Sequence, residues 1–308
     1  MAAQELYEDL RPGAFAVAYR MLGSVSEAED VVQEGLLRLH QAIEGGEPVQ
    51  SPRAYVTTIV TRLAIDELRS ARARRETYVG EWLPEPLIGA DDDDPVRHAE
   101  MADSLSLAFL VVLESLSPEQ RAVFLLREVF DYPYERIAAI VGKSEVATRQ
   151  IATRARRHVD DRRPRYEASR RRREELAQRF VAAAQKGELA TLEALLAEDV
   201  ELHGDGGGRV PALARSVHGR GRVARTLSSW FEMARRGGGV EVRQAEINGQ
   251  PGAMIVDTDG SLVAVWSLGI AEGRIQSIRS IVNPDKLAHL GPVSGLTALL
   301  ERAGWREG

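Results

Sequence analysis

A segment at residues 134–157 carries the side chains best suited to chemistry with nucleic acid. It reads as a short helix, a turn at Gly142 and a second helix capped by Ser144. The side chains expected to face inward are small or apolar: Ile137, Ala138, Val141, Val146, Ile151 and Ala155. Those expected to be exposed on the second helix are polar or charged: Glu145, Thr148, Arg149, Gln150, Thr153, Arg154 and Arg157. Such side chains bind base edges and phosphates, so the pattern predicts a DNA-reading helix-turn-helix. The alternative is a helical hairpin with a charged outer face.

Two earlier helices carry polar side chains that suit contacts with large partners. The first is amphipathic and could dock on the helices of another protein, although a solvent-facing helix has the same pattern. Its candidate contact residues are Asp30, Val31, Gln33, Glu34 and Arg38. The second, from Arg53 to Arg75, combines threonines, a tyrosine and terminal arginines, which fit single-stranded DNA. Its candidate contact residues are Tyr55, Arg62, Arg69 and Arg72.

Near the C-terminus, imidazole and carboxylate groups offer acid–base chemistry. The candidates are His203, Asp205, His218 and Asp257. Asp205 precedes three glycines, Gly206, Gly207 and Gly208, and then Arg209. Because three glycines make a mobile backbone and catalysis needs held geometry, this loop suits close approach of a partner better than catalysis. Histidines that are solvated or structurally satisfied are the favoured interpretation.

The elements that must position these residues predict a multidomain fold: two all-α domains followed by an α+β cone. Helices are expected over 5–78, with Ser24 or Ser26 as a cap and stops at Gly23 and Gly45, and again from 104. Helices at 174–185 and 189–196 precede valine- and isoleucine-rich strands. The predicted strands span 200–203, 240–247, 253–257, 262–270 and 275–282. The expected divisions are a first helical domain (1–80), an acidic proline-containing linker (81–103), a helix-turn-helix domain (104–165), the cone (166–290) and a tail (291–308).

The totals restrict the class of protein. The 308-residue chain has no cysteine, which excludes disulfides and thiolate metal sites, and neither a cofactor nor a metal is expected. Neither a signal peptide nor a membrane span is evident, so a cytoplasmic protein is expected. The net charge of −6 hides segregated blocks: 12 basic and 4 acidic residues over 143–173, against 9 acidic and 1 basic over 76–103.

The three basic and amphipathic blocks, in this order, resemble the extracytoplasmic-function sigma factors of the sigma-70 family. The resemblance implies that Asp30–Glu34 docks on the clamp helices of the largest subunit of RNA polymerase core, within region 2. It implies that the Arg53–Arg75 stretch opens and reads the −10 element. The helix-turn-helix resembles region 4, which reads the −35 element and contacts the polymerase flap. Gly35, Leu36 and Leu39 depart from the threonine, large aromatic residue and tryptophan that are usual in the family.

Further motifs resemble the subgroup with a SnoaL-like (NTF2-like) extension, called sigma-J-like. They are Trp82-Leu83-Pro84-Glu85-Pro86, Asp205–Arg209 and Asn283-Pro284-Asp285-Lys286. The resemblance implies a sigma factor that initiates transcription at promoter DNA, is not an enzyme, and is regulated from within by its C-terminal domain. That domain leaves room for an unknown small ligand or regulatory protein as a further partner, and no membrane contact is expected.

Two hypotheses and two alternatives follow. We expect the C-terminal domain to pack on the linker around Trp82–Pro86, because an apolar anchor lies between rigid prolines in an acidic segment. Asp91–Asp94 are expected to disfavour binding of free DNA by charge repulsion. The alternatives are a ligand-sensing helix-turn-helix regulator, and an NTF2-like isomerase or hydrolase with helical appendages.

Overall fold

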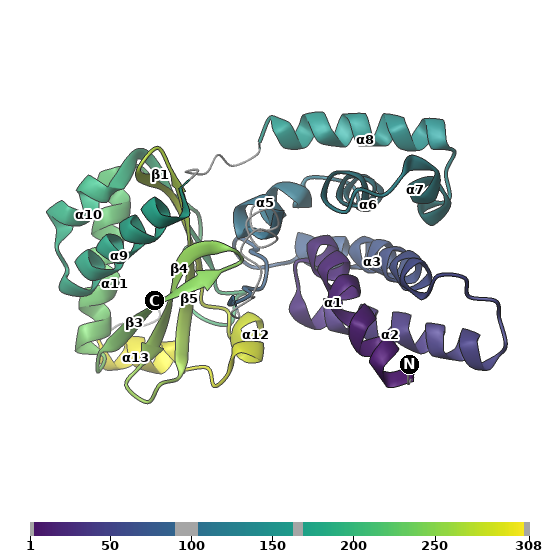
Figure 1. The fold of residues 1–308 in the computed structure, drawn as a ribbon. Coiled ribbons are helices and arrows are strands. Elements are labelled where there is room, and N and C mark those ends of the chain that lie inside the picture. The colour runs from purple at the N-terminus through teal and green to yellow at the C-terminus, as the bar shows by residue number, and fades with distance from the viewer. Residues whose placement is uncertain (1–2, 90–103, 163–168, 305–308) are drawn as a thin grey trace. The chain divides into compact units, whose positions relative to one another are not determined.

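The computed structural model describes residues 3–89, 104–162 and 169–304, which divide into two units (Figure 1). The first unit comprises Met1–Thr77 and Leu110–Arg163, and the second comprises Tyr78–Phe109 and Pro164–Gly308. The described part of the expected linker, residues 81–89, therefore belongs to the same unit as the cone.

Helices joined by short irregular segments make up the described part of the first unit. Its elements are α1 (Ala3–Leu22), α2 (Val25–Glu44), α3 (Pro52–Glu76), α5 (Leu107–Glu114, which crosses the boundary between the units), α6 (Pro118–Phe124), the π-helix η1 (Leu125–Val129), α7 (Tyr134–Val141) and α8 (Glu145–Asp160). We call α1–α3 the N-terminal bundle and α6–α8 with η1 the helix-turn-helix module. The π-helix was not predicted from the sequence.

Local sequence sets the ends of these helices. Gly23 has a φ of 70°, and the side chain of Ser24 accepts a hydrogen bond from the backbone N–H of Glu27 at 3.2 Å. Ser117 and Gln120 form a reciprocal capping box at the start of α6. The predicted cap at Ser24 and the predicted stop at Gly45, the C-cap of α2, are confirmed.

A buried arginine joins the two parts of the first unit. Arg121 of α6 is 1% exposed, and its Nε donates a hydrogen bond to the backbone oxygen of Arg20 in α1 at 3.0 Å. Its Nη1 is paired with the carboxylate of Glu114. Because a buried charge requires compensation, this contact fixes how α6 lies against α1.

The second unit is an α+β cone. Its helices are α9 (Arg170–Lys186), α10 (Leu189–Leu195), α11 (Arg220–Arg236), α12 (Pro284–Leu287), the 3₁₀ turn η2 (Ala288–Leu290) and α13 (Leu296–Arg302). Its strands are β1 (Leu196–Asp205), β2 (Val217–His218), β3 (Val240–Ile247), β4 (Gln250–Asp257), β5 (Leu262–Ala271) and β6 (Arg274–Ile281). All five predicted strands are present, whereas β2 was not predicted.

One six-stranded sheet forms the cone, in the order β2-β1-β6-β5-β4-β3. Tight turns at Asn248-Gly249 and Glu272-Gly273 have positive φ at both positions, which suits two-residue hairpin turns. Neighbouring strands pair antiparallel except for β1 and β6, which pair in parallel with Leu202 opposite Ile278. Figure 1 shows α9, α10 and α11 covering one face of the sheet.

The segment after residue 290 is part of the cone, unlike the tail expected from the sequence. Leu262 donates its backbone N–H to Pro292 at 2.8 Å and accepts from Ser294 at 2.8 Å. The side chain of Leu299 in α13 is 2% exposed and belongs to the core cluster of the cone. The segment adds to the fold because its leucines bury apolar surface against α11 and the sheet.

Membrane-spanning helices and metal-binding clusters are absent from the described residues. No helix among them combines the length and apolar character needed to cross a bilayer. Within the same ranges, no group of three or more histidines and carboxylates is arranged to hold a metal ion.

Candidate functional site

Helices α7 and α8 have helix-turn-helix geometry. Gly142 ends α7 in the left-handed conformation, with φ 67° and ψ 39°. The Ser144 Oγ accepts a hydrogen bond from the backbone N–H of Ala147 at 3.2 Å and so caps α8. Ile137 and Ile151 are buried in the small core that joins the two helices. The turn therefore presents the first turns of α8 at the surface.

The exposed face of α8 differs from the predicted face at two positions. Val146, which was expected to be buried, is 67% exposed, whereas Thr148, which was expected to be exposed, is 0% exposed. Thr148 shares the buried face with Ile151 and Ala155, while Val146 lies roughly 200° away from Thr148 around the helix. The Thr148 hydroxyl donates to the backbone oxygen of Ser144 at 3.0 Å, so its burial leaves no unpaired donor.

The remaining predicted DNA contacts of this helix are on the surface. Exposed side chains there are Ser144, Glu145, Arg149, Gln150, Thr153, Arg154 and Arg157. Arg149 pairs with Glu145 and lies 4.9 Å from the ring centroid of Tyr134. Exposed ion pairs of this kind contribute little to stability, so Arg149 can exchange this partner for a phosphate or base at low cost.

The predicted docking face of α2 is largely exposed. Asp30, Gln33 and Arg38 are exposed, Glu34 is partly buried, and Arg38 Nε donates to Glu34 Oε1 at 2.7 Å. Leu37, which the sequence analysis did not select, is 47% exposed among these polar groups. A polar face with one exposed leucine suits the surface of a partner protein.

Two positions of α2 point instead toward the rest of the bundle. Val31 is 8% exposed, so its side chain is not part of the exposed face, although it was a candidate contact residue. Gly35 is buried, and a Cβ built on it would lie 2.8 Å from Cγ2 of Val60 in α3. The glycine at this position therefore allows α2 and α3 to approach closely.

The candidate −10 residues of α3 lie against the helix-turn-helix module. Arg62 Nε donates to the backbone oxygen of Ile140 at 2.9 Å, and its Nη2 donates to that of Ala139 at 2.9 Å. These carbonyls belong to the last turn of α7, where backbone oxygens lack helical partners. Arg69 pairs with Asp66 at 3.0 Å and with Glu119 of α6 at 3.0 Å.

Tyr55 lines a hollow between α3 and α7 together with Arg62, Arg136 and Ile140. Arg72 falls in the last turns of α3. In this arrangement Arg62 and Arg69 contact other parts of the protein, although they were predicted to contact DNA.

Asp205, at the end of β1, is the centre of a second site. Its side chain is fully buried and accepts hydrogen bonds from Tyr78 Oη at 2.6 Å and from the backbone N–H of Leu83 at 2.8 Å. Lys286 Nζ donates to the same carboxylate at 2.6 Å. We call Asp205, Asn283 and Lys286 the linker-binding cluster and residues 78–89 the anchored segment.

Lys286 binds the anchored segment in two further ways. It is 6% exposed, and its Nζ donates to the backbone oxygen of Leu83. The same Nζ lies 4.3 Å from the ring centroid of Trp82 and 5.0 Å from that of Tyr78. A desolvated cation near aromatic rings is attracted by their electrons, which adds to the ion pair with Asp205.

Asn283 and the glycine loop complete the cluster. Asn283 Nδ2 donates to Tyr78 Oη at 2.9 Å, and its Oδ1 caps α12 by accepting from the backbone N–H of Asp285 at 3.0 Å. A Cβ on Gly207 would lie 2.2 Å from Asn283 Nδ2, and one on Gly208 would lie 3.0 Å from Val79. The glycines are thus needed where the loop and the anchored segment meet. Arg209 pairs with Asp285 at 3.0 Å on the exposed rim.

The rest of the anchored segment contacts η2 and the turn between β3 and β4. Pro84 and Pro86 are buried, and His289 Nε2 bonds the backbone oxygen of Pro86 at 2.9 Å. Leu87 exchanges two hydrogen bonds with Asn248, both of 2.8 Å. The anchored segment is therefore attached along its length, and Asn248 and His289 belong to a contact that the sequence analysis did not identify.

Tyr78 was also missed, and its environment is unusual. Burial, followed by its hydrogen bond to Asp205, raises the pKa of Tyr78 well above the ordinary range. Its hydroxyl therefore remains protonated and continues to donate to Asp205. The signal that could have identified it is its position four residues before Trp82 in the same acidic segment.

The candidate acid–base groups are each engaged in structural contacts. His203 Nδ1 lies 2.8 Å from Glu81 Oε1, and His218 Nδ1 lies 3.3 Å from Glu201. Asp257 accepts from the backbone of Asp259 and Ser261 in a turn, and a hydrogen bond from Ser294 is the main cause that lowers its pKa. Asp205 belongs to the linker-binding cluster.

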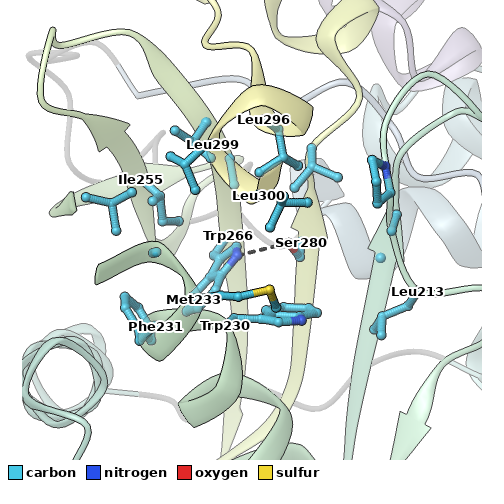
Figure 2. A pocket seen from close by; sticks show the side chains of 18 residues that line it. Leu213, Trp230, Phe231, Met233, Ile255, Trp266, Ser280, Leu296, Leu299 and Leu300 are labelled. Atoms are coloured by element: carbon cyan, nitrogen blue, oxygen red, sulfur yellow. Dashed lines mark hydrogen bonds between the residues drawn. The ribbon is translucent and has the colours of Figure 1, made fainter. Parts of the chain in front are cut away.

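A separate cavity of about 320 Å³ lies inside the cone, beside Trp266 (Figure 2). None of the four candidate acid–base residues is among the described residues that line it. The candidate chemistry and the cavity are therefore separate features. The aspartates at 91–94, expected to repel DNA, lie outside the described residues.

Comparison with known proteins places these features in a family. Residues 6–74 match Sigma-70 region 2, and residues 106–159 match Sigma-70, region 4. The chain is 36% identical over 295 residues to the "ECF RNA polymerase sigma factor SigJ" of Mycobacterium tuberculosis, covering 91% of each. It is 32% identical over 274 residues to the "Probable ECF RNA polymerase sigma factor SigI" of the same species, covering 88% of this chain and 90% of that one.

The fold is similar to a solved structure over nearly the whole chain. The crystal structure of Mycobacterium tuberculosis SigJ superposes with a TM-score of 0.72 and 33% identity, covering 92% of this chain and 98% of that chain. This likeness and the observed elements confirm the predicted fold class of two all-α parts followed by an α+β cone.

Proposed function

Because the chain belongs to the extracytoplasmic-function sigma factors of the sigma-70 family, we propose that it directs core RNA polymerase to specific promoters and that its cone regulates this step in cis. The observation that carries the regulatory part is the linker-binding cluster. Asp205 and Lys286 of the cone bind the segment that follows region 2 and leads toward region 4. The N-terminal bundle is region 2, and the helix-turn-helix module lies in region 4.

Region 2 docks on the clamp helices of the largest polymerase subunit through the exposed face of α2. Asp30, Gln33, Glu34 and Arg38 supply polar contacts, and Leu37 supplies the apolar one. The buried Val31 supports this face from within the bundle. Region 4 contacts the polymerase flap and reads the −35 element with α8.

Opening of the −10 element requires a rearrangement within the first unit. Arg62 and Arg69 bind α7 and α6 in the structure, so they bind DNA only after the helix-turn-helix module leaves α3. Phosphate groups then replace the carbonyl and carboxylate partners of these arginines. The free protein is thus held in a form that disfavours promoter binding.

The cone regulates by attaching the connection between the two regions, and it does not act as an enzyme. In support of this, His203, Asp205, His218 and Asp257 have structural partners away from the cavity. Attachment of residues 78–89 shortens the free tether between α3 and region 4. Since a shorter tether raises the effective concentration of one module near the other, attachment favours the closed form of the first unit.

Transcription in vitro tests the central proposal. Purified core RNA polymerase should start transcription at discrete sites on genomic DNA only when the full chain is added, and the two should co-elute in gel filtration. A ligand-sensing regulator would instead bind its operator in the absence of polymerase. An NTF2-like enzyme would show turnover that is independent of polymerase.

Arg154→Ala should weaken binding of the holoenzyme to its promoter. If Arg154 contacts a base edge of the −35 element, the loss is about 1–3 kcal/mol, or roughly 5- to 150-fold in affinity. Arg156→Ala is the matched control, because Arg156 lies on the same helix but pairs with Glu128 of η1. Fluorescence anisotropy with labelled promoter DNA measures both. Equal losses in the two variants would contradict the assigned face.

Trp82→Ala should raise transcription at limiting protein concentration. The change removes the ring that faces Lys286 Nζ, loosens the anchored segment and lengthens the free tether. Val79→Ala is the control, because Val79 is 65% exposed on the same segment. Circular dichroism should show that both variants keep their helices. Transcription equal to that of the unmodified chain would remove the regulatory role of this contact.

A further inference from the structure

The cavity of the cone has walls that are apolar on almost every side. Trp230 and Phe231 come from α11, Ile255 from β4, and Trp266 from β5. Its volume of about 320 Å³ falls within the range of small-molecule sites in proteins. Interiors are otherwise close-packed, so the apolar walls of a cavity of this size offer many atomic contacts to a bound molecule.

The polar content of the wall indicates the chemistry of that ligand. Ser280 is the one hydroxyl-bearing residue among the described lining residues, and no charged side chain is among them. Its Oγ accepts a hydrogen bond from Trp266 Nε1 at 2.9 Å (Figure 2), which leaves the hydroxyl able to make one further contact. A charged ligand would lose its hydration without gaining a counter-ion. The wall therefore fits a neutral molecule with little polar surface.

Helix α13 closes one side of the cavity. Figure 2 shows Leu296, Leu299 and Leu300 on the side of Trp266 opposite to Trp230 and Met233. Arg302 Nε holds the end of this helix by donating to the backbone oxygen of Gly237 at 3.0 Å. The cavity thus lies between helices α11 and α13 and the sheet.

The same strands connect the cavity with the linker-binding cluster. Gly204 of β1 lines the cavity, and the next residue, Asp205, binds Tyr78 and Leu83. Val282 also lines the cavity, and the next residue is Asn283 of the cluster. The backbone N–H groups of Val282 and Asn283 both donate to the backbone oxygen of Asp205, at 2.9 and 3.0 Å. A change in the packing of the cavity therefore acts on strand ends that hold the anchored segment.

We propose that the cavity binds a neutral, mostly apolar small molecule, and that binding stabilises the attachment of the anchored segment. The binding step depends only on the cone, whereas its effect on transcription rests on the proposed function above. The ligand contacts Trp230 and Trp266, and one polar group of the ligand meets the Ser280 hydroxyl.

Two fluorescent probes with one scaffold test the ligand class. N-phenyl-1-naphthylamine is neutral and has a single N–H, and 1-anilinonaphthalene-8-sulfonate is the same scaffold with an added anion. The full chain should bind the neutral probe at one site with enhanced, blue-shifted emission, and the sulfonate at least about tenfold more weakly. No saturable binding of the neutral probe, or equal binding of both, would overturn the proposal.

Matched substitutions on α11 locate the site. Ala234→Phe fills the cavity and should reduce the affinity of the neutral probe about tenfold or more, whereas Ser229→Phe adds the same ring on an exposed position. Leu300→Trp fills the cavity from α13 and serves as a second test should Ala234→Phe fail to fold. Unchanged affinity in a folded filling variant would place the probe elsewhere and overturn the site.

Amide exchange tests the connection to the anchored segment. Saturation with the neutral probe should slow exchange of the amides of Leu83 and Leu87, which bond Asp205 and Asn248, and leave exchange in α8 unchanged. Binding with unchanged exchange at both leucines would overturn the coupling. Neither fluorescence nor exchange involves polymerase, so these outcomes are distinct from failure of the sigma-factor assay.

Discussion

Asp205→Ala is expected to weaken the attachment of the anchored segment by about 3–5 kcal/mol, because it leaves the buried Lys286 without its counter-ion. Tyr78 and the Leu83 backbone lose their acceptor in the same change. The backbone oxygen of Asp205 still accepts from Val282, so the pairing of β1 with β6 should remain. Hydrogen exchange of residues 78–89 measures the loss directly.

Two further variants separate the effect of the unpaired Lys286 charge from the effect of losing an ion pair at the surface. Adding Lys286→Met to Asp205→Ala removes the uncompensated charge, so the double variant should recover part of the lost attachment. Arg209→Ala removes only the exposed pair with Asp285 and should cost at most about 1 kcal/mol. If Asp205→Ala and Arg209→Ala changed the hydrogen exchange of residues 78–89 equally, the linker-binding cluster would contribute no more to the attachment than an exposed ion pair does.

Sequence reasoning succeeded where the determinants are local. Ser24 and Ser144 each cap a helix through their own side chain, and Gly142 in the left-handed conformation ends α7. Such signals depend on a few neighbouring residues, so the helix starts could be predicted from the chain. The residue types of the glycine loop also indicated a close approach, which Gly207 makes against Asn283.

Sequence reasoning failed where the partner is distant along the chain. Asp205 was recognised as unusual, yet its bond to Tyr78 spans 127 residues and has no local signal. The contact of Arg62 with the end of α7 also joins residues far apart in the chain, so no local signal predicted it. Val146 was predicted to be buried because it is apolar, and Thr148 to be exposed because it is polar. The buried face of α8 is instead set by Ile151 and Ala155, and Thr148 lies on that face. The cavity likewise depends on α13, whose contacts with α11 could not be inferred from the chain.

Gly35→Thr is expected to destabilise the N-terminal bundle by about 1–3 kcal/mol, although threonine is usual at this position in the family. A Cβ at Gly35 would lie 2.8 Å from Val60 Cγ2, which is on a stiff, fully buried β-branched side chain. The clash outweighs the gain of less than about 1 kcal/mol that a helix obtains by losing a glycine. Urea unfolding followed by circular dichroism measures the change.

A glycine elsewhere in the bundle provides the matched control. Gly13 lies within α1 and has nothing within 4 Å of a built Cβ, so Gly13→Ala should stabilise by about 0.5–1 kcal/mol, whereas Gly35→Ala should not. Combining Gly35→Ala with Val60→Ala should cost less than the sum of the two single changes, because the new methyl group occupies space that the valine vacates. Strict additivity would mean that the two residues do not compete for the same space.

Gly35 faces α3 while Gln33 lies on the exposed face of α2, so Gln33→Ala should weaken polymerase binding without changing stability.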